Sequence, residues 1–224
     1  EGASDRLQLT AKTLADYLGR ISKAQFKVAA GDGTHGIVVG TARSFPSLEF
    51  LSEFDPTDIT RREEYLLRSH SDGIWLIGAT ELAVEHAAWD LLYRLGHRQF
   101  FPGEIWEVVP TVNDLSVEVD TFERPDYLSR RIWYGFGMWG YNTEPYNKWC
   151  VRNRCVQGIH LSTGHAYDGV VKAARNEFDR HPEYWPLLDG QRKPVRNPKP
   201  CLSNPAVRSL FIQNALQQLA KKPG

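Results

Sequence analysis

The chain has 224 residues, which is enough for one large domain or two small ones. Its 27 basic and 27 acidic side chains cancel to a formal charge of zero, and no basic block of the kind that contacts phosphates occurs, so we expect no nucleic-acid partner. No apolar run reaches the roughly 20 residues that cross a bilayer, so we expect no membrane span.

The ends and the composition set further expectations. The chain begins at Glu1 and its single methionine is Met138, so we expect a processed mature protein or an excised piece, with any signal peptide out of view. Three cysteines are too few for a disulfide framework. Aromatic residues make up 12% of the chain. Because flat aromatic faces serve both protein cores and sugar-binding sites, the composition leaves both roles open.

The first 70 residues predict a helix followed by strands. Leu14, Leu18 and Ile21 recur at helical spacing after Thr10, the expected N-cap. The stretches AQFKVAA (24–30) and HGIVVGTA (35–42) are then expected to be strands. Residues 44–66 are polar and irregular, and a short helix is expected near 56–65.

A strand and a well-marked helix follow. GIWLIGA (73–79) is apolar and closed by glycine, as in a buried strand. Thr80 caps the next helix, and Gly96 is expected to end it in a left-handed conformation. The alternation predicts an α/β domain with helices packed on a sheet. GDGTHG (31–36) lacks the lysine and hydroxyl residue of a phosphate loop and precedes a strand, so we expect no cofactor.

Residues 73–110, GIWLIGATELAVEHAAWDLLYRLGHRQFFPGEIWEVVP, carry a resemblance. This order of strand, helix, LG, aromatic residues, PG and VP resembles the N-terminal domain that precedes the catalytic barrel in α-glucuronidases and β-hexosaminidases. It is most similar to an uncharacterised bacterial family of glycoside-hydrolase-like proteins, over most of residues 8–110. The resemblance implies a hexosaminidase or α-glucuronidase-like α/β domain over residues 1–124. Leu115, Val117 and Val119 are expected to form the edge strand that closes it.

A second set of motifs resembles the same family in the same order. It comprises a glycine–histidine pair (Gly164–His165), HPEY (181–184), DGQR (189–192) and CLSNP (201–205). The resemblance implies that residues 125–224 are the start of a (β/α)8-type barrel, with RRIWYGFGMWG (130–140) as its first strand. Because such a barrel takes about 250 residues, it would be incomplete in this chain.

The last elements are expected to be helical. Residues 168–179 are weakly helical in pattern. Asn204 and Pro205 then suit the first positions of a closing helix, with an apolar face of five residues: Val207, Leu210, Phe211, Ala215 and Leu219. The loop 181–207 before it would lie where barrel enzymes build their active sites.

The chemistry of the second half favours binding over catalysis. Glycoside hydrolysis needs two carboxyl groups about the scissile bond, and the acidic residues after Pro125 form no adjacent pair in the sequence. The resemblance implies that the catalytic acids lie on later barrel strands, so they are expected outside this chain. The predicted substrate-binding residues are Trp139, Arg152, Asn153 and His165. Arg152 and Asn153 suit carboxylates or hydroxyls, whereas His165 is a polar contact, a general base or a buried core histidine.

The cysteines and histidines between 150 and 165 raise a different possibility. Cys150, Cys155, His160 and His165 recur every five residues. The spacing of each pair is compatible with zinc, but the short middle gap leaves no room for the usual finger elements, so we expect no metal. A Cys150–Cys155 disulfide has about the same weight as the zinc site.

Two classes of function therefore stay open. One is a glycoside-hydrolase-like protein that acts on glycans, secreted or periplasmic as the resemblance implies. The other is a non-catalytic carbohydrate-binding or assembly module. A carbohydrate ligand is expected in both.

Overall fold

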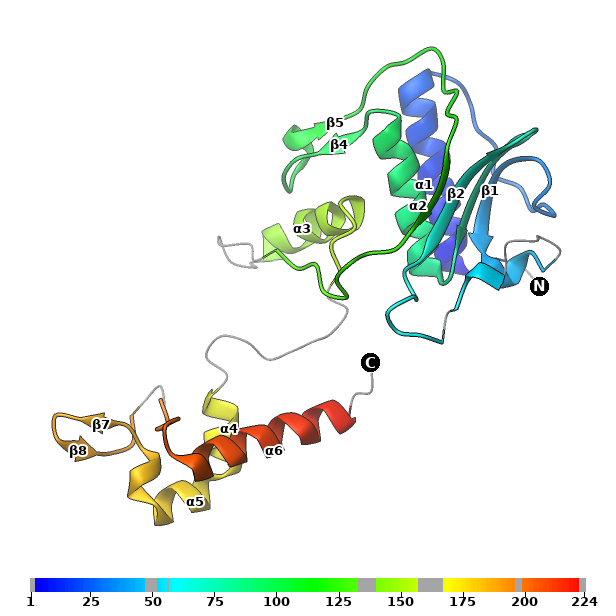
Figure 1. The fold of residues 1–224 in the computed structure, drawn as a ribbon. Coiled ribbons are helices and arrows are strands. Elements are labelled where there is room, and N and C mark those ends of the chain that lie inside the picture. Colours follow the sequence, from blue (N-terminus) through cyan, green and yellow to red (C-terminus); the bar gives the residue numbers. More distant parts are fainter. Residues whose placement is uncertain are drawn as a thin grey trace. The chain divides into compact units, whose positions relative to one another are not determined.

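A four-stranded mixed sheet forms the centre of the first of two units in this computed structural model (Figure 1). The structure describes residues 3–46, 52–55, 57–132, 140–156, 167–195 and 199–221. The first unit extends to Gly158 and the second begins at Ile159. Both contain helices and strands, so the predicted α/β class is confirmed.

The sheet has the strand order β1-β3-β2-β6. Strands β1 and β3 are parallel, and the other two pairs are antiparallel. The bounds of the strands are β1 Gly36–Thr41, β2 Tyr65–His70, β3 Gly73–Gly78 and β6 Asp120–Glu123. The inner strands β2 and β3 carry the fully buried residues Leu66, Leu67, Leu76 and Ile77, which accounts for the apolar runs 65–67 and 74–77.

Helices α1 (Asp5–Ser22) and α2 (Glu81–Arg94) pack side by side against one face of this sheet (Figure 1). The predicted core positions of α1, Leu14, Leu18 and Ile21, are buried there. The N-cap prediction was wrong, because Ser4, not Thr10, caps the helix and accepts a hydrogen bond from the Leu7 amide. The buried stripe extends two turns earlier than Leu14, to Leu7, so the helix starts at Asp5.

Both predicted ends of α2 are confirmed. The Thr80 side chain accepts a hydrogen bond from the Ala83 amide, and Gly96 has a φ of 96°. A side chain at Gly96 would be strained by that φ and would also stand 3.2 Å from Pro110. The chain therefore turns sharply after the helix and enters the short hairpin of β4 (Arg98–Gln99) and β5 (Glu107–Val108).

Two expectations for the first 70 residues were wrong. Residues 24–30 form no strand; they are mostly exposed and pair with no other strand, although Phe26 packs on the core. The described residues of 56–65 form turns rather than a helix, and Tyr65 already begins β2. Strand β2 itself was missed, although Ser71-Asp72-Gly73 lies between two apolar runs, which is a hairpin signal.

The closing edge strand is present but starts later than predicted. Leu115, Val117 and Val119 pack against the core as expected, and the Val119 carbonyl accepts a hydrogen bond from the Ser69 amide. The regular ladder with β2 begins only at Asp120.

The first unit extends beyond Pro125 to Gly158, so the division between the two units does not coincide with the expected boundary at 124. Helix α3 (Gly140–Arg152), which the sequence did not predict, packs near α2. Most of the expected first barrel strand, residues 133–139, lies outside the described residues.

The second unit is small and mostly helical. Its elements are α4 Tyr167–Ala173, α5 Arg175–Arg180, the two-residue strands β7 Leu187–Leu188 and β8 Gln191–Arg192, and α6 Pro205–Lys221. Helices α4 and α5 confirm the weak helical pattern. Asn204 caps α6 as predicted, because its side chain accepts a hydrogen bond from the Ala206 amide at 2.9 Å.

The core of the second unit consists of Val171, Phe178, Tyr184, Trp185 and Val207. Of the predicted apolar face of α6, Val207 is buried and Leu210 and Phe211 pack against this core, whereas Ala215 and Leu219 are exposed. The core reaches only the first half of the helix.

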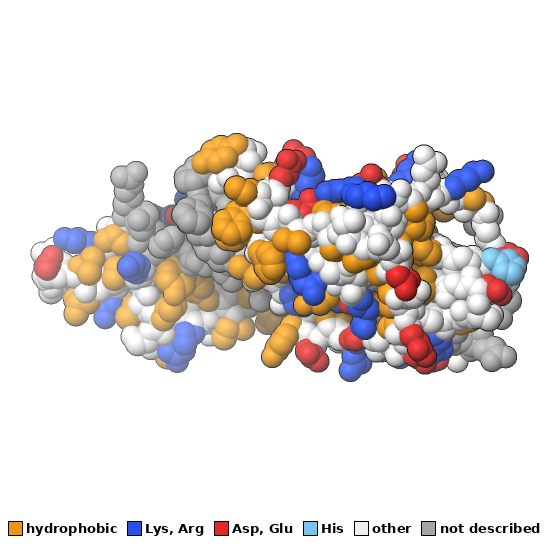
Figure 2. All heavy atoms as spheres, turned by 90° about the horizontal axis from the view of Figure 1, so that it is seen from above, with side chains coloured by type: hydrophobic (Ala, Val, Ile, Leu, Met, Phe, Trp, Pro, Cys, Tyr) orange, Lys and Arg blue, Asp and Glu red, His pale blue; other side chains and the backbone are white. Residues whose placement is uncertain are grey.

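The described residues show no membrane-spanning helix, no large charged surface on the face drawn and no closed barrel. None of the helices described is long and apolar enough to cross a membrane. On the face seen in Figure 2, basic and acidic side chains are interspersed, so no large field of one sign forms there. No closed barrel occurs in the described part of the chain.

Candidate functional site

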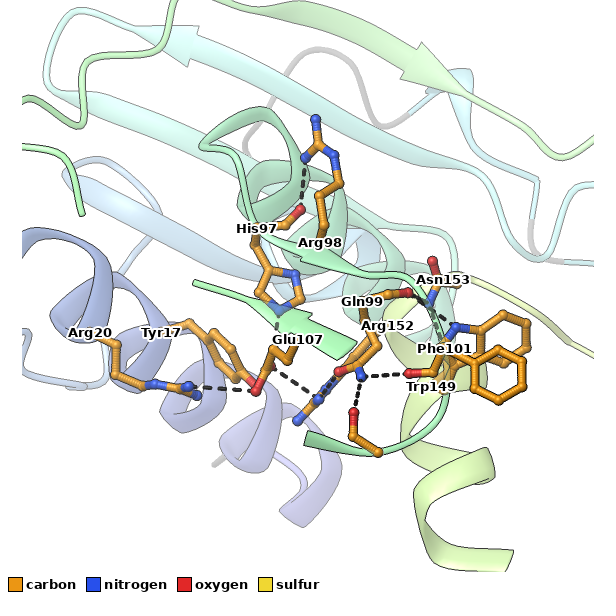
Figure 3. Close-up of polar contacts among 11 residues, drawn as sticks. Tyr17, Arg20, His97, Arg98, Gln99, Phe101, Glu107, Trp149, Arg152 and Asn153 are labelled. Atoms are coloured by element: carbon orange, nitrogen blue, oxygen red, sulfur yellow. Dashed lines mark hydrogen bonds and ion pairs between the residues drawn. The ribbon is translucent and has the colours of Figure 1, made fainter. Parts of the chain in front are cut away.

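The candidate site lies around the β4–β5 hairpin, where α1, the end of α2 and α3 meet (Figure 3). A hydrogen bond from the His97 amide to the Leu92 carbonyl fixes the sharp turn after α2. The two short strands are joined through residues 100–106, which include the 3-10 turn Glu104–Trp106. The site has an inner polar side and an exposed aromatic side.

Glu107 is the centre of the polar side. Its carboxylate accepts hydrogen bonds from the Tyr17 hydroxyl at 2.5 Å and from His97 Nε2 at 3.0 Å. Arg152 Nη1 lies 3.1 Å from the same carboxylate, and Arg20 Nη2 lies 3.5 Å from it. Only 10% of the Glu107 side chain is exposed. One buried charge therefore joins α1, the hairpin and α3.

The protonation states follow from these contacts. Burial opposes ionisation of Glu107, but the hydrogen bonds from Tyr17 and His97 and the two arginine charges outweigh it and lower its pKa. Burial and the bond to Glu107 raise the pKa of Tyr17 to about 12. Burial lowers the pKa of His97 despite the neighbouring carboxylate. The cluster is thus a carboxylate with a neutral phenol and a neutral imidazole.

The predicted residues Arg152 and Asn153 lie beside this cluster, at the end of α3. Arg152 Nη1 donates to the Gln99 side-chain oxygen as well as contacting Glu107. Asn153 Nδ2 donates to the carbonyls of Gln99 and Trp149, each at 3.0 Å. Their polar groups hold the hairpin, so substrate contact by either residue stays a prediction. Trp139 and His165, the other two predicted residues, lie outside the described residues.

Gln99 was missed from the sequence, although it organises the hairpin. The residue is 5% exposed, and its side-chain amide donates to the carbonyls of Phe101 and Gly103 at 2.8 and 2.9 Å. Its own backbone carbonyl accepts from Trp149 Nε1 at 3.1 Å. No sequence motif marks this role, because Gln99 is one of several polar residues in the hairpin.

The outer side of the hairpin carries exposed aromatic and aliphatic side chains. Phe100 is 66% exposed, Ile105 90% and Trp106 51%. Phe101 is 37% exposed and packs edge-to-face on Trp106, with ring centroids 5.8 Å apart. Side chains of this type on one exposed turn mark an interaction site more often than isolated apolar residues do.

The carboxylates after Pro125 have a different character. None of the seven is buried. Five make local pairs with basic side chains or histidine: Glu144–Lys148, Asp168–Lys172, Glu177–Arg180, Asp179–Arg175 and Glu183–His181. The other two, Asp126 and Asp189, are exposed. Glu177 also lies near His181, so that the two ring nitrogens of this histidine contact Glu177 at 3.9 Å and Glu183 at 3.0 Å.

A second buried polar cluster lies at the start of β2. Glu63, only 1% exposed, pairs with Arg130 Nη2 and lies 3.5 Å from His86 Nδ1. Burial, followed by the charges of Arg130 and Arg154, lowers the pKa of His86 to about 3, so the imidazole is neutral and its contact with Glu63 is not an ion pair. Arg154 donates to the Tyr65 hydroxyl at 2.8 Å and lies 3.4 Å from Asp90.

The residues that suggested a metal site are only partly described. All three cysteines are free thiols. His160 and His165 lie outside the described residues, and the residues that are described include no group of three potential ligands close enough to hold a metal ion.

Comparison with known proteins gives one assignment. No curated protein matches the chain. A family model described as "Domain of unknown function (DUF4838)" matches residues 101–224, starting in the β4–β5 hairpin and continuing through the rest of the chain. This match covers more than half of the 224 residues, and the chain therefore belongs to the DUF4838 family.

Proposed function

We propose that this chain supplies glycan contacts in a glycoside-hydrolase-like protein whose catalytic carboxylates lie outside it. The observation that carries the proposal is the β4–β5 hairpin, with Phe101 and Trp106 exposed on one side and Gln99 and Glu107 buried on the other. A rigidly held aromatic surface can stack on the apolar face of a sugar ring without the cost of ordering a mobile loop. Secretion or a periplasmic location, and a barrel beginning after Pro125, belong to the same proposal.

The carboxylates favour placing the reaction elsewhere. A glycosidase holds its two carboxyl groups roughly 5 to 9.5 Å apart across the bond it cleaves, and one of them needs a raised pKa. Glu144 and Glu183, by contrast, are exposed and have lowered pKa values, because Lys148 bonds the first, and the backbone amide of Glu183 and then His181 bond the second. Glu107 and Glu63 are buried in ion pairs that hold the fold.

The binding part is tested with Trp106→Ala and its neighbour Ile105→Ala as a matched control. Soluble polysaccharides that contain glucuronic acid or N-acetylhexosamine serve as probes in affinity electrophoresis. We expect the wild-type chain to be retarded and Trp106→Ala to lose about tenfold in affinity, since one stacked aromatic contributes roughly 1 to 1.5 kcal/mol. Ile105→Ala removes a more exposed but non-aromatic side chain and should bind like the wild type.

The catalytic part is tested with aryl glycosides, including glucuronides and N-acetylhexosaminides. The chain alone should show no turnover. Turnover that is lost on replacing one of its own acidic residues would contradict the placement of the catalytic carboxylates. Equal binding by Trp106→Ala and the wild type would instead contradict the role of the hairpin.

The exposed half of α6 favours a second candidate, an assembly module. Ile212 and Leu216 are about 60% exposed, and Leu219 is 48% exposed. An apolar stripe of this kind suits contact with another protein surface. The two candidates differ in one measurement, because an assembly module would bind none of the polysaccharides.

A further inference from the structure

We propose that Cys150 and Cys155 form a reversible redox pair that locks the end of helix α3. Both thiols are free in the structure, and four residues separate them. The proposal concerns a modification site, and it holds whether or not the hairpin binds glycans.

The geometry comes from the way the helix ends. Arg154 has a φ of 56°, in the left-handed region, and its amide donates to the Val151 carbonyl at 3.1 Å. The Cys155 amide donates to the Cys150 carbonyl at 2.8 Å. These are the two hydrogen bonds of a Schellman motif, in which Cys150 is the third residue from the helix end and Cys155 is the second residue beyond the cap.

The motif places the two side chains next to each other. In Schellman motifs a hydrophobic contact commonly joins these two positions, and here both are cysteine. A disulfide requires backbones held close together with converging side chains, which the 2.8 Å bond between the two residues favours. Each thiol is half-buried, and burial raises the pKa of both, with the nearby Cys150 adding to the effect on Cys155.

Three of the four residues enclosed by the pair help to attach α3 to the rest of its unit. Arg152 contacts Gln99 and Glu107, and Asn153 donates to the Gln99 carbonyl. Arg154 contacts Tyr65 and Asp90. A disulfide would close a six-residue ring around all three and restrict the unfolded chain more than the folded one.

The chemistry needs a disulfide reagent such as oxidised glutathione. The thiolate of one cysteine attacks a sulfur of oxidised glutathione, which forms a mixed disulfide with the protein and releases one reduced glutathione. The second cysteine, as thiolate, attacks the first and releases the other glutathione. Two protein thiols lose two protons and two electrons, and one glutathione disulfide becomes two thiols. Because the raised pKa values keep both cysteines protonated near neutrality, the reaction should accelerate as the pH rises.

To test the proposal, the reduced full chain is incubated with oxidised glutathione at about pH 8.5, close to the ordinary pKa of a thiol. Trypsin cleaves after Arg152 and Arg154, so mass spectrometry without reductant should find the fragments that begin at Trp149 and Cys155 joined. Dithiothreitol should separate them. The melting temperature of the oxidised chain should rise by roughly 5 °C.

Two variants control the result. Cys201→Ser removes the thiol of the second unit and should leave the cross-link unchanged. Cys150→Ser should abolish both the cross-link and the rise in melting temperature. Recovery of Cys150 and Cys155 as free thiols, each bound to glutathione, or joined to Cys201, would overturn the proposal.

Discussion

At the scale of single residues, Glu107 shows how a buried charge can organise a surface. Its carboxylate is surrounded by Tyr17, Arg20, His97 and Arg152, which come from α1, the hairpin turn and α3. A buried ion pair is weak evidence for net stability, but removing one partner leaves the others uncompensated. The charge therefore matters most for keeping the hairpin in one position.

Replacing Glu107 with glutamine tests this role. The side chain keeps its size but no longer balances Arg20 and Arg152, so we expect the free energy of unfolding to fall by about 2 kcal/mol at pH 7. Chemical denaturation monitored by circular dichroism measures this change in unfolding free energy. Glu104→Gln, an exposed change on the same hairpin, should fall within about 0.5 kcal/mol of the wild type.

The difference in unfolding free energy between the wild type and Glu107→Gln should become smaller in acid. The folded pKa of Glu107 lies below its ordinary value of 4.5, so its stabilising contribution is complete above that pH and is lost as the pH falls through the folded pKa. A difference between wild type and Glu107→Gln that stayed constant down to pH 3 would show that the charge has no such role.

His86 should make stability depend on pH in a second window. Its folded pKa is about 3, because burial and then three arginine charges disfavour the charged imidazole, whereas the unfolded residue titrates near 6.5. Between these values the unfolded chain takes up a proton that the folded chain does not, so stability falls as the pH is lowered, by up to about 1.4 kcal/mol per unit.

His86→Gln removes this titration. We expect the slope of unfolding free energy against pH between 6 and 4 to be smaller in this variant, whatever its stability at pH 7. His35→Gln, which changes an exposed histidine, should keep the wild-type slope. Equal slopes in all three proteins would mean that His86 is protonated in the folded state.

At the scale of elements, buried charges attach the part of the first unit that follows Pro125 to the rest of that unit. Arg130 Nη2 pairs with Glu63, whose other carboxylate oxygen is buried and has no hydrogen-bond partner among the described residues. Arg154 contacts Tyr65 and Asp90 from the end of α3. These contacts join residues more than 60 positions apart in the sequence, so they make the residues around Arg130 and Arg154 part of the same folded unit as β2 and α2.

Arg130→Ala measures the strength of this attachment. Because Glu63 would remain buried without its cation, we expect a loss of about 3 kcal/mol in unfolding free energy. Lys148→Ala removes an exposed basic residue that pairs with Glu144 within α3, and it should cost less than about 0.5 kcal/mol. Similar effects of the two changes would show that the Glu63 pair contributes little.

The elements also show what the sequence could reveal. Helix α2 was predicted with both ends because Thr80 and Gly96 are local signals that depend on neighbouring residues only. Residues 24–30 were assigned wrongly, because a strand is defined by a partner elsewhere in the chain. Strand β2 was missed although its hairpin partner β3 follows it directly. Arg152 and Asn153 were selected for their chemistry, but their long-range partners Gln99 and Glu107 were not visible in the pattern.

At the scale of the whole chain, the two units differ in how much apolar core they contain. The first unit buries residues from α1, α2 and the strands β2 and β3 in one cluster. In the described part of the second unit, which begins at Ile159, the hydrophobic core cluster contains five buried residues. A unit of fewer than about 70 residues rarely stabilises itself with a core of that size.

Three fragments test this division against the boundary expected from the sequence. Residues 1–158 should unfold cooperatively, within roughly 5 °C of the full chain, because they keep Arg130 and Arg154 with their acidic partners. Residues 1–124 lack both arginines and should melt at least about 5 °C lower, since Glu63 and Asp90 lose these cations. Residues 159–224 alone should give the circular dichroism of a largely unfolded chain. If residues 1–124 were as stable as residues 1–158, the domain boundary would lie at Pro125 and α3 would belong to the following domain.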